Sequence, residues 1–336
     1  MKTQLSASVL CGMVALSAGV VQAEGSLTLG GDVELNIDAV SHQSGGDTFD
    51  DNGRIKLDAG GEWTDGNRFV KAKVQPLIPF RENNTNIAIL DSSASVSGTN
   101  EIAYDDVFLQ FGSKAWDVQM GRFEAMNLFP LGKDVFVPRA GEVWIYEANI
   151  VRGRRDDVLH AAFHMNPNTQ THLELGTMYY KDGDASISGV RPAVTYDFGN
   201  AKVWGGYESS VEKDSGGSKT RDGHGGGIGG SVKLGGGDMA ASYTAGKNKL
   251  TDDKAQSVAI NYTRDNWGLG YIYSKQDVSG SSADPKVYSV YGAYTVPIFG
   301  PESGAAVTFA AGTSSSKHGS DDDKVSGARV RFTYNF

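Results

Sequence analysis

The sequence predicts an all-β chain that folds as a sixteen-stranded antiparallel transmembrane β-barrel, and three observations lead to this prediction. The last residues alternate between apolar and polar side chains up to Phe336. The first residues contain an uncharged apolar run that is typical of an export leader. Between them, short alternating runs recur and are separated by turn residues. Strands of this kind bury one face and leave the other in water.

The N-terminal leader predicts export. An uncharged stretch covers residues 5–21, and Ala23 supplies the small residue that precedes a signal-peptidase cleavage site. We therefore expect a signal peptide over residues 1–23 and an exported domain over residues 24–336. Cleavage would remove Cys11, the only cysteine, so the exported domain would contain no disulfide.

The composition narrows the class of protein further. The chain has 44 glycines, 14 tyrosines and 14 phenylalanines but only 9 prolines, which suits β-structure with many turns. After the leader, no apolar run reaches the ~20 residues that a membrane helix needs. The formal net charge of −9 argues against a nucleic-acid partner.

Sixteen alternating runs can be followed along the exported domain. The expected strands lie near residues 26–39, 53–63, 68–79, 101–112, 116–123, 156–165, 171–181, 189–198, 201–212, 225–234, 238–248, 255–264, 267–277, 286–296, 304–315 and 324–336. Tight turns such as Asp265-Asn266 should alternate with longer polar loops, which we place at 40–52, 80–100, 213–224 and 316–323. This alternation predicts an up-and-down barrel with both termini on the periplasmic side. A soluble β-sandwich or propeller is the alternative, but neither explains the leader and the terminal strand together.

The C-terminal strand has a further meaning. From residue 329 to 336 every even position is apolar and every odd position is polar. An aromatic residue at the end of such a strand resembles the sorting signal of bacterial outer-membrane barrels. The resemblance implies that Phe336 is read by the barrel-assembly machinery. It also implies that the apolar face of the strand meets outer-membrane lipids.

One connection, from about residue 124 to 155, is too long for a passive connector. Here the sequence resembles the sixteen-stranded porins of Gram-negative bacteria, and more closely their glycoporin branch typified by the raffinose porin. The likeness rests on Gly121-Arg122, Pro130-Leu131-Gly132-Lys133-Asp134 and Arg154-Arg155. It implies that this third extracellular loop folds into the barrel and narrows it, with loop carboxylates facing wall arginines. It also implies a homotrimer.

The chain departs from the family motif within this loop. Asp134 matches the acidic end of the motif, but the motif's glutamate has no counterpart because Leu131 follows Pro130. Lys133 adds a positive charge close by. The departure predicts a pore that is near neutral or mildly anion-preferring, in place of the family's usual cation preference.

Strand phase predicts which side chains face the lumen. In the second and third strands the apolar residues share one phase, so the basic residues on the other phase point inward, namely Arg54, Lys56, Lys71 and Lys73. The first strand contributes Asp32, Glu34, Asn36 and Asp38 to the same interior. Rows of opposite charge that face each other would create a transverse field across the pore. The alternative is that these residues only pair with one another.

The predicted constriction combines the loop with the wall. Its residues are Asp134, Glu142, Glu147, Lys133, Arg54, Lys56, Lys71, Lys73, Arg154 and Arg155. Three aromatic side chains of the loop could stack on sugar rings or pack against the barrel wall, namely Phe136, Trp144 and Tyr146.

Two other patterns carry no chemistry in this interpretation. His160 and His164 would lie roughly 13 Å apart on one strand face, too far for one metal ion, so we interpret them as lining the lumen. Gly225, Gly227 and Gly230 match a dinucleotide-binding pattern, but the βαβ context is missing. No cofactor and no metal are predicted.

The sequence thus predicts a passive channel in the bacterial outer membrane for small hydrophilic solutes, such as sugars and ions. An outer-membrane barrel enzyme is one alternative, but no histidine near a loop lies in a recognisable catalytic motif. A structural or adhesive barrel with a closed lumen is the other alternative. Conductance in a planar bilayer would distinguish the three functions.

Overall fold

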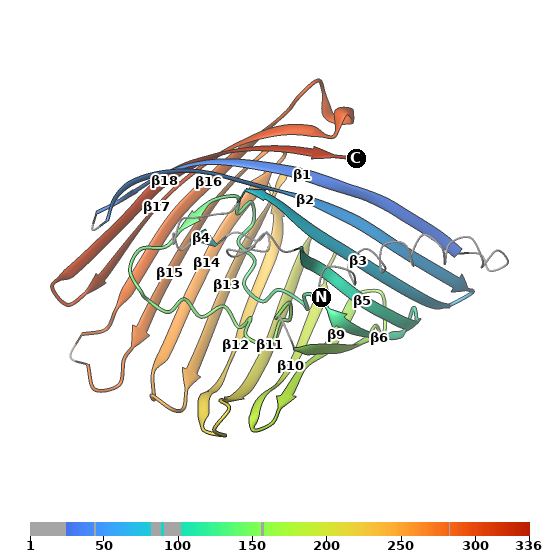
Figure 1. Cartoon of the computed structure of the whole chain (residues 1–336), viewed down its shortest axis with the longest axis horizontal. Helices are drawn as coiled ribbons and strands as arrows, with labels where there is room; N and C mark the ends of the chain where they lie inside the picture. Colours follow the sequence, from blue (N-terminus) through green and yellow to red (C-terminus); the bar gives the residue numbers. More distant parts are fainter. Residues whose placement is uncertain (1–24, 44, 82–88, 91–101, 156–157, 282) are drawn as a thin grey trace, which may run out of the picture.

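Sixteen strands of the computed structural model form one closed antiparallel barrel, as predicted (Figure 1). The structure describes residues 25–43, 45–81, 89–90, 102–155, 158–281 and 283–336. The barrel strands are β1 (Gly25–His42), β2 (Gly46–Asp65), β3 (Arg68–Arg81), β5 (Ala103–Ser113), β6 (Trp116–Arg122), β8 (Leu159–Met165), β9 (Thr171–Asp182), β10 (Ala185–Asp197), β11 (Ala201–Lys213), β12 (Lys219–Leu234), β13 (Gly237–Asn248), β14 (Lys254–Arg264), β15 (Trp267–Asp277), β16 (Lys286–Pro297), β17 (Ala305–His318) and β18 (Asp321–Asn335). The predicted signal peptide lies outside the described residues and stays a prediction.

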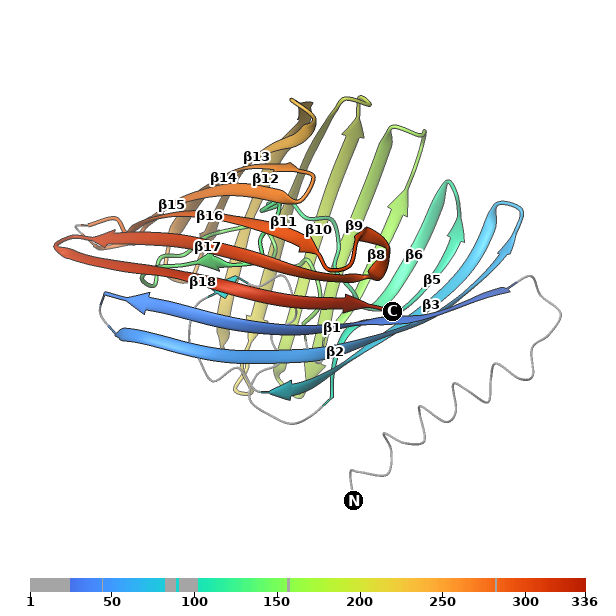
Figure 2. The same ribbon diagram turned by 90° about the horizontal axis from the view of Figure 1, so that it is seen from above.

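Each barrel strand pairs with the barrel strands before and after it in the chain, and the strands run obliquely around the barrel (Figures 1 and 2). The first strand closes the sheet by pairing with β18. At this seam the backbone of Gly31 donates a 3.0 Å hydrogen bond to Phe336 and accepts another 3.0 Å bond from it. The last residue of the chain is therefore part of the closing ladder.

Side chains alternate between an apolar and a polar face of the barrel. Ile260 on β14 and Leu175 on β9 are exposed, whereas their neighbours Asn261 and Glu174 are buried. Apolar side chains on the exposed face and polar ones on the buried face fit a barrel that meets lipid outside and encloses a polar interior. In the described parts of the chain, no helix is long and apolar enough to cross a membrane.

Three of the four predicted long loops are wrong. β1 and β2 are joined by residues 43–45, β11 and β12 by residues 214–218, and β17 and β18 by residues 319–320. The strands thus take up most of the predicted loops at 40–52, 213–224 and 316–323. Hydrophobic alternation stops there although backbone pairing continues, because both faces of a strand that extends beyond the lipid layer meet water. The fourth predicted loop, 80–100, lies largely outside the described residues.

Candidate functional site

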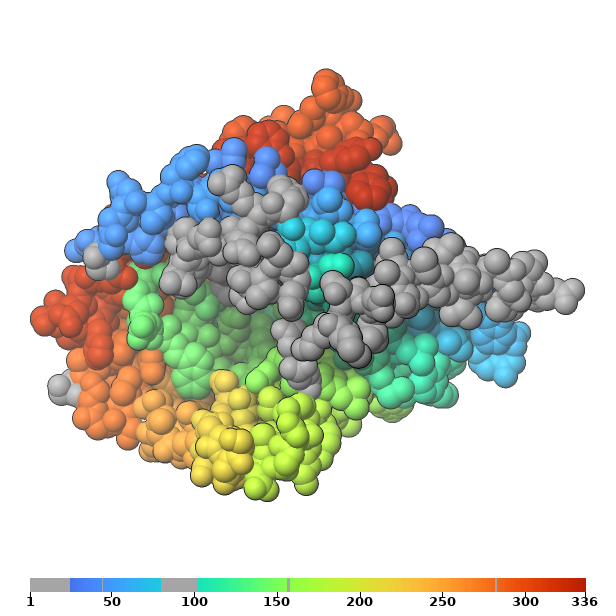
Figure 3. All heavy atoms as spheres, viewed as in Figure 1, coloured from blue at the N-terminus to red at the C-terminus, as the bar shows by residue number. Residues whose placement is uncertain are grey.

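The connection between β6 and β8, whose residues 123–155 are called the long loop below, packs against one side of the barrel wall. Its apolar side chains that are at most 1% exposed include Leu128, Phe129, Phe136, Val137 and Tyr146. They belong to three clusters that include wall residues such as Trp204 on β11, Ile272 on β15 and Ala310 on β17. Figure 3 shows atoms of this loop (green) in the hollow between the β1–β2 side (blue) and the strands from β11 onward (yellow to red).

The backbone of the long loop finds its hydrogen-bond partners on the wall. Most of the loop has no regular structure, although β7 (Val137–Pro138) pairs with β4 (Ile89–Leu90) in a separate two-stranded sheet. Polar wall side chains donate to its carbonyls: Asn261 to Pro130 (2.8 Å), Tyr291 to Leu131 (2.8 Å) and Ser289 to Pro138 (2.9 Å). Buried backbone groups need such partners, so these wall residues fix the path of the loop.

Two buried charged residues of the wall hold the two ends of the long loop. Arg191 on β10 is fully buried and donates to the carbonyls of Met126 (2.6 Å) and Ala148 (3.1 Å). Glu208 on β11, 1% exposed, accepts bonds from the Tyr146 hydroxyl (2.8 Å) and the backbone N–H of Val151 (3.0 Å). Neither residue was predicted from the sequence to have a role. In the sequence, each of them is a charged residue in the middle of a strand, at a position whose side chain faces the polar side of the sheet.

Glycines in β12 and β13 make room for the Tyr146 ring. A Cβ added at Gly225 would lie 2.5 Å from the Tyr146 hydroxyl, and one added at Gly246 would lie 2.7 Å from its ring carbons. Real Cβ atoms do not approach so closely, because the atoms would overlap. Gly225 of the glycine-rich strand β12 therefore has a packing role.

The predicted wall cations pair with neighbouring strands. Arg54 lies 3.0 Å from Asp32 and 3.4 Å from Glu34, and Lys56 lies 3.0 Å from Asp32. The expected rows of opposite charge facing each other across the lumen are wrong, because β1 and β2 are adjacent and place Lys56 directly opposite Asp32 in the ladder. Opposite charges on adjacent strands cancel locally, so these two rows do not by themselves create a transverse field.

The third strand continues this charged wall. Lys73 lies 3.8 Å from both Asp58 on β2 and Asp106 on β5. Lys71 lies on the same strand, opposite Gln110 of β5 in the ladder.

Of the loop cations, Arg154 and Arg155 reach two different strands. Arg154 lies 2.7 Å from Asp105 and 2.9 Å from Asp106, both on β5. Arg155 lies 2.7 Å from Glu212 at the end of β11. The two arginines thus connect the end of the loop to the barrel on opposite sides of it.

The predicted loop carboxylates are separated from one another. Glu147 forms an ion pair with Arg139, a residue that the sequence analysis missed. Glu142 is exposed, whereas Lys133 and Asp134 are half-buried. Burial lowers the pKa of Lys133 below its ordinary value. The structure therefore does not gather the ten predicted constriction residues into one cluster.

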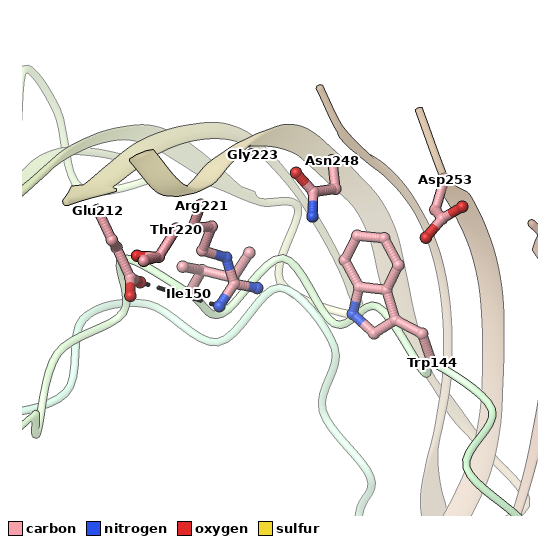
Figure 4. A pocket seen from close by; sticks show the side chains of 8 residues that line it. All are labelled: Trp144, Ile150, Glu212, Thr220, Arg221, Gly223, Asn248 and Asp253. Atoms are coloured by element: carbon pink, nitrogen blue, oxygen red, sulfur yellow. Dashed lines mark ion pairs between the residues drawn. The ribbon is translucent and has the colours of Figure 1, made fainter. Parts of the chain in front are cut away.

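The three predicted sugar-stacking residues have different surroundings. Phe136 and Tyr146 are buried against the wall, so stacking on a solute is not available to them. Trp144 lines a cavity of about 410 Å³ together with Arg221, Asn248 and Asp253 (Figure 4). In Figure 4 the Trp144 ring lies near Asn248 and Asp253, and an ion pair between Arg221 and Glu212 lies at the other end of the cavity.

The prediction that His160 and His164 line the lumen is wrong. Both are buried, at 1% and 7% exposure. His160 stacks on the ring of Phe123, and its Nδ1 lies 3.1 Å from the Phe123 carbonyl at the start of the long loop. His164 lies between Asp117 (2.6 Å) and Glu174 (3.5 Å). The long loop covers this part of the wall, and the sequence could not show that.

Comparisons with known proteins agree with this architecture. A family model described as porin-like glycoporin RafY matches residues 29–191. Among solved structures, the chain is similar to an anion-selective porin from Comamonas acidovorans, with 15% identity, a TM-score of 0.62, and coverage of 93% of this chain and 100% of that chain. It is also similar to in-vitro folded OmpT, an outer membrane protein of Vibrio cholerae, with 14% identity, a TM-score of 0.59, and coverage of 94% and 100%. No curated protein sequence is significantly similar to the chain.

The closed sixteen-stranded barrel with a polar interior is the fold that the chain shares with these outer-membrane proteins. The family model over residues 29–191 covers just under half of the chain and supports a likeness to the Gram-negative porins, and within them to the raffinose-type glycoporin branch. The predicted resemblance is therefore confirmed. Family and fold favour a channel over an enzyme and support a location in the outer membrane.

Proposed function

We propose that this porin is a passive channel for small hydrophilic solutes and that the long loop folds into the barrel and narrows the path. The observation that carries the proposal is the contrast between two sides of the interior. Most of the loop is bonded to wall residues from β9 to β18, and only its end reaches β5 through Arg154, whereas the basic residues of β2 and β3 keep some exposure. Side-chain exposure there is 14% for Arg54, 24% for Lys56 and 26% for Lys73. A water-filled path between the loop and this wall fits both features.

The path should be near neutral or mildly anion-preferring. Most of the cations that we assign to it have carboxylate partners, as Arg54 has Asp32 and Arg155 has Glu212. Paired charges largely cancel for an ion a few ångströms away, so neither sign dominates. The chain also lacks the glutamate of the family motif, so the path contains one negative charge fewer than in the family. The similar porin from Comamonas acidovorans is described as anion-selective, which is consistent with this proposal.

Neutral sugars are the solutes that best suit the cavity at Trp144. The cavity at Trp144 includes Asn248 and Asp253, which flank the connection between β13 and β14. An aromatic face beside side chains that donate and accept hydrogen bonds can hold a sugar ring by stacking and by its hydroxyl groups.

Export and assembly complete the proposal. Residues 1–23 direct export, and the barrel-assembly machinery reads Phe336. The protein then works as a homotrimer among outer-membrane lipids. OmpT of Vibrio cholerae has been solved in a trimer form. An enzyme or a closed adhesive barrel stays the alternative, and either would show no passive conductance.

The experiment is conductance and reversal potential in a planar bilayer with a salt gradient. Stepwise conductance supports a channel. Replacing both Arg154 and Arg155 with alanine leaves Asp105, Asp106 and Glu212 without these partners, so the reversal potential should move toward cation preference. Arg68→Ala, which removes an ion pair at the exposed turn after β2, is the control. A wild-type pore that is already strongly cation-selective, or a double variant without a shift, contradicts the constriction.

Sugar block of the same channels tests the solute. A neutral trisaccharide should lower the ion current, and Trp144→Ala should weaken this block by roughly five- to tenfold, the value of one lost aromatic contact. Trp63→Ala removes a tryptophan at the opposite rim and should leave the block unchanged. Equal block in wild type and Trp144→Ala contradicts a sugar site at this cavity.

A further inference from the structure

We infer that His164, His172 and Glu174 form a binding site for a divalent transition-metal ion at the barrel end near the turn between β8 and β9. Each of the three side chains offers one ligand atom, and these atoms lie within 4.8 Å of one another. The antiparallel hairpin brings them together, because His164 on β8 is directly opposite Glu174 on β9 and His172 lies two residues before it. His160 and His164 lie on one strand, whereas the three residues of this site come from two paired strands.

The hydrogen bonds of both histidines suit metal ligands. Nδ1 of His164 lies 2.6 Å from Asp117, and Nδ1 of His172 lies 2.8 Å from the side-chain oxygen of Asn166. When Nδ1–H donates to these oxygens, the lone pair of Nε2 on each ring is available to a metal. Nε2 of His164 points toward Glu174, at 3.5 Å. Histidine ligands in proteins usually donate their second ring N–H in this way, which fixes tautomer and ring orientation.

The donor set suits zinc and its neighbours in the first transition row. Two imidazoles and one carboxylate are a known combination for Zn²⁺, with the fourth position taken by water. Ligand atoms around a tetrahedral zinc ion lie about 3.4 Å apart, given bonds of about 2.1 Å. The three atoms must therefore approach one another by at most about 1.4 Å from their present limit of 4.8 Å. His172 is only half-buried, so its side chain can make this adjustment.

The site is also accessible from outside the packed interior. A cavity of about 500 Å³ at this end of the barrel is lined by His172, Asn166, Gln170 and Asp197. A hydrated ion can reach His172 through this cavity without passing the long loop.

A protonated His164 between two carboxylates is the simpler arrangement, but it does not account for His172. The two imidazole rings lie 5.3 Å apart and tilt by 30°. A proton on His164 would disfavour a charge on its neighbour, whereas one metal ion uses both rings at once.

The test uses the folded, untagged barrel in detergent, from which metals have first been removed with a chelator. The barrel is titrated with Zn²⁺, and binding is measured by calorimetry. We expect one equivalent per chain. His172→Gln should weaken binding by at least about tenfold, and Asn166→Ala, which removes the outer partner of His172, should weaken it by about tenfold. His318→Gln, an exposed histidine at the opposite end of the barrel, is the matched control and should bind like wild type.

Co²⁺ absorption and zinc anomalous scattering decide the case if a variant folds poorly. Absorption bands typical of tetrahedral Co²⁺, and an anomalous peak among the three side chains, would support the site. Binding that is equal in wild type and His172→Gln, or wild-type binding far below one equivalent, would overturn it.

Discussion

Along β10 and β11 the long loop covers the polar face of the barrel, and the charged wall residues there are almost fully buried. Arg191 is 0% exposed and Glu208 is 1% exposed. Along β2 and β3 the wall carries charges as well, but the basic side chains of Arg54, Lys56 and Lys73 keep contact with solvent, at 14%, 24% and 26% exposure. We call the first region the packed side and the second the charged side. The buried charges of the packed side hold the loop in place, whereas we expect the charges of the charged side to act on passing ions.

The two kinds of charge contribute different amounts to the free energy of unfolding, and the reason is their contact with water. A buried ion that loses its partner cannot regain water, and this costs about 3–5 kcal/mol. A pair that keeps contact with solvent contributes only about 0–1 kcal/mol, because water replaces the missing partner. Removing single charges from each side therefore tests whether the two sides differ as described.

The largest effect is expected on the packed side. Arg191→Ala leaves Glu174 and the carbonyls of Met126 and Ala148 without their buried donor. The free energy of unfolding should fall by about 3–5 kcal/mol, measured by urea unfolding in lipid vesicles. Arg68→Ala, at a turn where the side chain is 73% exposed, should change it by less than about 0.5 kcal/mol. A loss below about 1 kcal/mol for Arg191→Ala would mean that water reaches Glu174.

Tyr146→Phe should have a smaller effect on the same side. It removes the hydroxyl that donates to Glu208, but Glu208 keeps the backbone N–H groups of Ile150 and Val151. We expect a loss of about 1.5–3 kcal/mol, as for a hydrogen bond to a charged group.

The pH dependence of this loss gives a second test. Burial, and next the negative charge of Glu208, raise the pKa of Tyr146 above its ordinary value. A raised pKa in the folded state means that the contribution is complete below the unfolded pKa of about 10 and is lost as the pH rises above it. The difference between wild type and variant should therefore stay constant from about pH 6 to about pH 9 and shrink above about pH 10. A difference that already shrinks near neutral pH contradicts the buried hydroxyl.

On the charged side, Lys73→Gln should alter selectivity more than stability. Its two ion pairs are 3.8 Å long and partly exposed, so the free energy of unfolding should fall by no more than about 1 kcal/mol. The reversal potential should move toward cation preference, because Asp58 and Asp106 lose a positive neighbour. If the variant unfolds as easily as Arg191→Ala, the distinction between the two sides is wrong.

The smallest effect on conduction is expected for deletion of Phe336, which lies on the seam between β18 and β1. The folded, heat-modifiable fraction in the outer membrane should fall, while each channel that inserts should conduct as wild type does. Normal assembly of the shortened chain would contradict the role of this residue as a signal.

The sequence was sufficient for the number and order of the barrel strands and for the polar face of β2 and β3, but not for the strand ends, which extend into three of the predicted loops. The period of two placed Arg54, Lys56 and Lys73 on the polar face, because that face is a local property of each strand. It could not show which residues meet across strands. Asp32 therefore turned out to be the neighbour of Lys56, and His172 joined His164 although eight positions separate them. The contacts of the long loop depend on residues such as Gly246, where the missing side chain leaves room for the Tyr146 ring. The sequence does not show that these two residues meet.

The contacts of Arg329 imply an order of events during folding. This residue of β18 donates to Asp38 on β1, 291 positions away, and to the carbonyl of Val135 in the long loop, 194 positions away. Its place is defined only when the last strand has joined the first. Contacts between residues that are this far apart in the chain form late in folding. The entropy of the intervening chain must be lost before these contacts contribute any favourable energy. The long loop, in the middle of the chain, therefore reaches its final packing only after β18 has paired with β1.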